Sequence, residues 1–71
     1  MYLVIEVQDD GNHVGTLSYE FDNYEDAEAK YHTILSVAAK SSVRCHGAII
    51  IGGARVINYE GFEHIPPEEM V

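Results

Sequence analysis

The sequence predicts a small α+β domain of two layers, in which four mainly antiparallel strands form one sheet and a single helix covers one of its faces. Three observations predict this class. Residues 2–8 and 14–21 alternate apolar and polar side chains, residues 23–39 carry apolar side chains at helical spacing, and two further apolar stretches flank Gly52 and Gly53. The expected order of elements is therefore β-β-α-β-β.

The first two strands are expected to form an antiparallel hairpin. Alternation along the first strand gives it one apolar face, made by Leu3, Ile5 and Val7. The apolar face of the second strand carries Leu17, Tyr19 and Phe21. Between the strands, the sequence DDGN at residues 9–12 favours a turn, because glycine and asparagine adopt positive φ more readily than other residues.

The helix is predicted to begin after Asp22, which has the side chain of an N-cap and is followed three residues later by Glu25. Acidic residues in the first turn also suit the positive end of the helix dipole. One stripe of the helix is apolar and is expected to face the sheet; it consists of Tyr24, Ala27, Tyr31, Ile34, Leu35 and Ala38.

The second hairpin is expected to pair residues 43–51 with residues 54–60 across a Gly52-Gly53 turn. This pairing makes both sides of the hairpin apolar. One side would carry Ile49, Ile51 and Val56. The other side would carry Ala48, Ile50, Ile57 and Tyr59, with Gly61 ending the strand.

Since one helix covers only one face of a sheet, we expect the second apolar face to bind another protein surface. The sequence favours a homo-oligomer, with a two-fold dimer as the simplest form. The predicted self-association face consists of Val4, Ile49, Ile51 and Val56. Two alternatives are that residues 62–65 fold back over this face, or that the strands are short edges.

The chain has 12 acidic and 4 basic residues and a net charge of −8. This charge argues against direct binding to nucleic acid or to an anionic membrane, both of which require cationic groups, and it allows a basic protein partner. A candidate acidic partner surface consists of Glu20, Asp22, Glu25, Asp26, Glu28, Glu60 and Glu63. Helix capping and solubility are the alternative explanation of these charges.

We expect no catalytic site, no metal site and no cofactor. Cys45 and His46 are adjacent on a predicted strand, so their side chains point to opposite faces and cannot form a nucleophile–base pair. The four histidines and the cysteine show no metal-ligand spacing. Cys45 is expected to be a small buried apolar residue, and His46 a strand residue with a polar partner.

We expect one domain over residues 1–65 and an extended C-terminal tail over residues 66–71, which begin with two prolines. A single cysteine rules out an internal disulfide and favours a reducing compartment. No apolar stretch approaches the roughly 20 residues that span a bilayer. These observations predict a cytoplasmic protein without a membrane segment.

Three segments resemble a group of short phage and prophage proteins of Firmicutes that have no assigned activity: residues 2–8, residues 27–35, and residues 41–43 with His46. The resemblance covers most of the chain, to about Glu60, and implies a phage-type accessory protein in a bacterial host cell or in the virion. The expected function is a non-enzymatic, self-associating protein-interaction module. The alternative is an acidic inhibitor that imitates nucleic acid and blocks a basic nucleic-acid-binding host protein.

Overall fold

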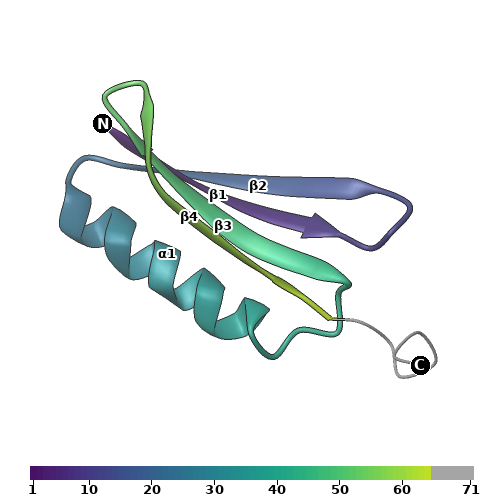
Figure 1. The fold of residues 1–71 in the computed structure, drawn as a ribbon. Helices are drawn as coiled ribbons and strands as arrows, with labels where there is room; N and C mark the ends of the chain where they lie inside the picture. Colours follow the sequence, from purple (N-terminus) through teal and green to yellow (C-terminus); the bar gives the residue numbers. More distant parts are fainter. Residues whose placement is uncertain (65–71) are drawn as a thin grey trace.

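The computed structural model describes residues 1–64 and confirms the predicted α+β class (Figure 1). The predicted tail, residues 66–71, and Ile65 lie outside the described residues. The elements are β1 (Tyr2–Asp9), β2 (Val14–Phe21), α1 (Tyr24–Ala38), β3 (Cys45–Gly52) and β4 (Arg55–Glu63).

The four strands form one antiparallel sheet in the order β2-β1-β3-β4 (Figure 1). The helix connects the edge strand β2 to the central strand β3, lies along one face of the sheet and contacts all four strands. β1 and β3 form the central pair. In the β1–β3 pair, Val4 is opposite Ile50 and Glu6 is opposite Ala48. Because side chains alternate along each strand, this register determines which side chains lie under the helix.

The core lies between α1 and this face of the sheet. The sheet contributes Val4, Ala48 and Ile50, which are almost completely buried. The apolar stripe of the helix is confirmed for Ala27, Tyr31, Ile34, Leu35 and Ala38, all of which are buried. Tyr24, which was predicted to belong to the stripe, is exposed and packs edge-on against Tyr2, with ring centroids 5.7 Å apart.

The first hairpin turn is closed by two aspartates. The Asp9 carboxylate accepts a hydrogen bond from the Gly11 backbone N–H, and the Asp10 carboxylate accepts from the N–H groups of Asn12 and His13, each at 2.8 Å. These backbone donors hold the pKa of Asp10 below its usual value. Gly11 adopts a φ of 96°, as the turn sequence predicted.

The predicted helix cap was wrong by one residue. The N-cap is Asn23, whose side-chain oxygen accepts a 2.9 Å hydrogen bond from the Asp26 backbone N–H. The Asn23 amide also donates to the Asp26 carboxylate at 3.0 Å, so Asn23 and Asp26 are joined by two hydrogen bonds. Asp22 has the right chemistry, but the chain becomes helical one residue later.

The second hairpin also differs from the prediction. The two turn residues are Gly53 and Ala54, with φ of 61° and 60°, so that Gly52 pairs with Arg55. Positive φ at both positions is typical of a type I′ turn, which matches the twist of a hairpin. A bulge follows, because Ile51 pairs with Val56 while Ile50 pairs with Asn58. β4 also continues through Gly61, which was expected to end it.

We predict that Asn23→Ala lowers the free energy of unfolding by about 1 kcal/mol, because it removes the side-chain acceptor at the start of α1. Asp22→Ala is the matched control and is expected to change stability by less than about 0.5 kcal/mol. Urea denaturation followed by circular dichroism measures both. A larger loss of stability for Asp22→Ala than for Asn23→Ala would contradict Asn23 as the N-cap and favour Asp22.

We predict that Ala54→Gly raises the free energy of unfolding by up to about 1 kcal/mol, since alanine at positive φ pays a steric cost that glycine avoids. Ala29→Gly, on the exposed side of the helix, should instead destabilise by about 1 kcal/mol. Thermal denaturation of the two variants should show shifts of opposite sign. A loss of stability for Ala54→Gly would contradict the turn geometry.

Candidate interaction face

The face of the sheet that points away from α1 is apolar. We call it the open face. The register of the strands assigns to it eight apolar residues: Leu3, Ile5, Val7, Val14, Ile49, Ile51, Val56 and Tyr59. Beyond Val14, the β2 side of the same face is polar and carries Thr16, Ser18 and Glu20.

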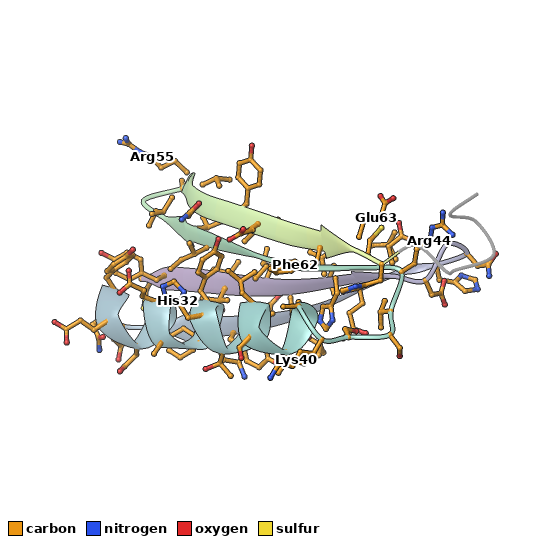
Figure 2. All side chains as sticks on the ribbon, turned by 60° about the horizontal axis from the view of Figure 1, so that its bottom comes forward. His32, Lys40, Arg44, Arg55, Phe62 and Glu63 are labelled. Carbon is orange, nitrogen blue, oxygen red and sulfur yellow. The ribbon has the colours of Figure 1, made fainter. Side chains whose placement is uncertain are left out.

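Within residues 1–64, no other element covers the open face (Figures 1 and 2). In Figure 2, Phe62 lies between the sheet and the helix, whereas Glu63, the next residue, points away from the helix. Val56 is 53% exposed and Tyr59 is 73% exposed, while the five residues on the central strands are half-buried by their neighbours. A solvated sheet face is normally polar, so this composition indicates a surface that binds another apolar surface.

The sequence placed Ile49, Ile51 and Val56 together on one face, and the structure does the same. It was wrong about Val4, which is fully buried under the helix. The reason is the β1–β3 register, in which Val4 is opposite Ile50 and shares its face, not that of Ile49. The residues of β1 that belong to the open face are the alternate set that begins at Leu3.

Tyr59 was also misplaced by the sequence analysis. The bulge at Ile57 adds one residue to β4, so the alternation of side chains reverses and Tyr59 lies opposite Ile49 on the open face. Ile57 instead points to the helix side, where it and Tyr2 fill the space above Gly52. A bulge cannot be predicted from alternation alone, although the interrupted pattern of β4 is compatible with one.

A hollow of about 490 Å³, open to solvent, crosses the open face. Its floor is formed by Gly47 and Gly61, which are paired across β3 and β4 and carry no side chains. Ile49 and Tyr59 border it on one side. Cys45 and Glu63 border it on the other side, with the thiol 4.0 Å from the carboxylate. Sequence analysis missed this feature, although glycine inside a strand often marks close approach of another group.

The helix side of the sheet holds a buried polar pair. The His46 ring Nε2 lies 2.6 Å from the Glu6 carboxylate, and the side chains are 3% and 14% exposed. Gln8 donates a second hydrogen bond to the same carboxylate oxygen at 3.2 Å. The polar partner predicted for His46 is therefore present. Cys45 and His46 point to opposite faces as expected, but Cys45 is only half-buried.

The seven predicted acidic residues do not share one face. Asp22, Glu25 and Asp26 are exposed around the start of α1, where Asp26 interacts with the N-cap. Glu28 accepts a hydrogen bond from the Tyr24 hydroxyl at 2.9 Å, which raises the pKa of that tyrosine.

The other three acidic residues are divided between the faces of the sheet. Glu20 and Glu63 lie on the open face, and Glu60 is on the helix side of β4, opposite Ala48. The predicted partner surface is thus split into at least two separate patches.

The described part of the chain has neither a candidate metal site nor a candidate membrane-spanning helix. No group of three or more histidine, cysteine or acidic side chains among residues 1–64 could hold a metal ion. No helix in this part of the chain is long and apolar enough to cross a membrane.

Comparison with known proteins adds no relative from which a function could be taken: no protein-family model, curated protein or solved structure matches the chain. The open face therefore has to be interpreted from its own chemistry.

We predict that His46→Leu lowers the free energy of unfolding by about 1–3 kcal/mol, because it leaves the largely buried Glu6 carboxylate without its closest partner. His32→Leu, at an exposed position on α1, should change stability by less than about 0.5 kcal/mol. Denaturation at pH 7 compares the two variants. Equal effects would show that the Glu6–His46 contact is of little importance to the fold.

Proposed function

We propose that the chain is a small, non-enzymatic protein-interaction module that associates with itself through the open face. The observation that supports this proposal is the apolar composition of a sheet face that α1 does not cover. Burial of one valine or isoleucine side chain contributes about 1.5–3 kcal/mol, so a face with several such residues gains much by being covered. The resemblance to phage proteins would make the chain a phage-type accessory protein.

The small size of the domain supports self-association as well. A chain of this length buries only roughly 60% of the surface that it exposes when unfolded, which leaves its stability marginal. Oligomerisation is a common way to stabilise such domains. Binding of a second copy to the folded state raises the apparent stability by mass action, so we expect the melting temperature to rise with protein concentration.

The acidic-inhibitor alternative receives less support from the structure. The exposed carboxylates at the start of α1 have a local explanation in the helix cap and the helix dipole. The other three residues of the predicted acidic surface, Glu20, Glu60 and Glu63, lie on both faces of the sheet, so they do not extend that patch into one surface that could imitate a nucleic-acid backbone.

The test is sedimentation equilibrium of the unmodified chain and of Ile49→Glu. We expect the unmodified chain to form a dimer at micromolar concentration. Ile49→Glu should weaken the dimer by more than about a hundredfold, because it brings a carboxylate into an apolar interface.

Val37→Glu is the matched control, because Val37 is an apolar residue on the outer side of α1 and is 56% exposed. This variant should associate like the unmodified chain. An unmodified chain that sediments as a monomer up to about 100 µM, a range that covers ordinary specific dimers, would contradict the proposal.

A further inference from the structure

The open face contains two neighbouring rows of very different size. The bulky row is the cross-strand pair Ile49 and Tyr59, and the glycine row is the pair Gly47 and Gly61, two residues further along. The bulky row borders the hollow, and the glycine row forms its floor. One face thus has both a projection and a depression that could receive it.

Only one of the two glycines leaves open space beside it. A Cβ atom at Gly47 would collide with the Glu60 carbonyl oxygen and the Gly61 Cα, so the backbone of β4 already fills that space and the fold itself requires glycine there. A Cβ atom at Gly61 would be 3.9 Å from its nearest neighbours, which is ordinary contact. Glycine inside a strand is also less favourable than a residue with a side chain. The structure of one chain therefore gives no reason for Gly61, and an approaching surface would supply one.

We propose that two copies pack their open faces about a two-fold axis that runs across the strands between the two rows, so that Tyr59 of each copy fills the space over Gly61 of the other and Ile49 lies over the backbone at Gly47. This inference rests on the proposed self-association. A two-fold axis makes both contacts at once. If Tyr59 of the first copy lies over Gly61 of the second, then Tyr59 of the second copy lies over Gly61 of the first. Alternation of large and small side chains across facing layers is how apolar surfaces interdigitate.

The position of this axis agrees with the size of the sheet. Midway between the rows lie Ala48 on β3 and its partner Glu6 on β1, close to the middle of their eight-residue strands. Rotation about this axis therefore places almost the whole of each strand over its counterpart, and Ile5 over Val7. The strand directions of two packed sheets differ by about 30°. This difference in angle moves rows near the centre of the sheet least, so the two central rows stay in contact.

The area available makes such full overlap necessary. Four strands spaced about 4.8 Å apart, with eight residues of about 3.4 Å each, form a face of about 500 Å². Two such faces bury about 1,000 Å², the lower end of the range for specific interfaces. An arrangement that overlapped only part of the sheet would be too small.

The experiment fills the hollow without disturbing the fold. Gly61→Val should leave the single chain folded, because a side chain at this exposed position meets only ordinary contacts. It should weaken the dimer by more than about tenfold in sedimentation equilibrium, since it occupies the space of Tyr59 from the other copy. Gly15→Val is the matched control: Gly15 is on an edge strand, is exposed and has open space around it, but lies on the helix side of the sheet. It should leave the dimer unchanged.

Tyr59→Ala gives a second, independent measurement if Gly61→Val fails to fold. It removes the projecting side chain and should also weaken the dimer by more than about tenfold, whereas Tyr59→Phe should retain it. The native thiol of Cys45, at the border of the hollow, should react more slowly with a maleimide above the dimer dissociation constant than below it.

The outcomes separate this inference from the proposed function. A dimer that Ile49→Glu disrupts, but that Gly61→Val and Tyr59→Ala leave unchanged, overturns the interlocking rows and retains self-association. An unmodified chain that remains a monomer overturns both. Binding of a small apolar molecule in the hollow of a monomer would also overturn the inference.

Discussion

The pairing of Val4 with Ile50 across the two central strands determines how the rest of the molecule is built. It places Val4, Ala48 and Ile50 on the same face, where the apolar stripe of α1 covers them. Alternation then sends Leu3, Ile5, Ile49 and Ile51 to the other face, whatever their hydrophobicity. A single helix of 15 residues has no second stripe for that face. The exposed apolar surface is thus a direct consequence of one helix on a sheet whose central strands are apolar on both sides.

The two faces of the sheet have different requirements. On the helix side, His46 and Glu6 each need the other as a polar partner, because charged and polar groups are costly to bury alone. On the open face, shape is more important than polarity: a row of two bulky side chains borders a row of two glycines. The β4 bulge connects these features, since it sends Tyr59 to the open face and Ile57 to the helix side. An irregularity of one residue therefore determines the shape of the interaction surface.

The element order and the layers follow from local patterns in the sequence, and so does the apolar excess. Alternation in residues 14–21 and the helical stripe from Ala27 to Ala38 are properties of single segments, and they appear in the structure as predicted. The predictions of the helix cap, the second hairpin turn and the face of Val4 were each wrong by one position. The structure has Asn23 as the cap and Gly53 and Ala54 as the turn, and it places Val4 under the helix. A shift of one residue changes the local free energy little, so the position is determined by the pairing of strands and by the packing of the helix on the sheet. The hollow over Gly47 and Gly61 needed the register of β3 and β4, which no segment contains alone.

The central claim is that a second copy covers the open face with its Tyr59 over Gly61. Isotope-filtered nuclear Overhauser spectroscopy on a mixture of labelled and unlabelled chains observes only contacts between copies. We expect cross-peaks between the Tyr59 ring protons of one copy and the Gly61 Hα protons of the other, at concentrations where the chain sediments as a dimer. A dimer with cross-peaks only from α1 or from the strand edges, and none from the open face, would contradict the account.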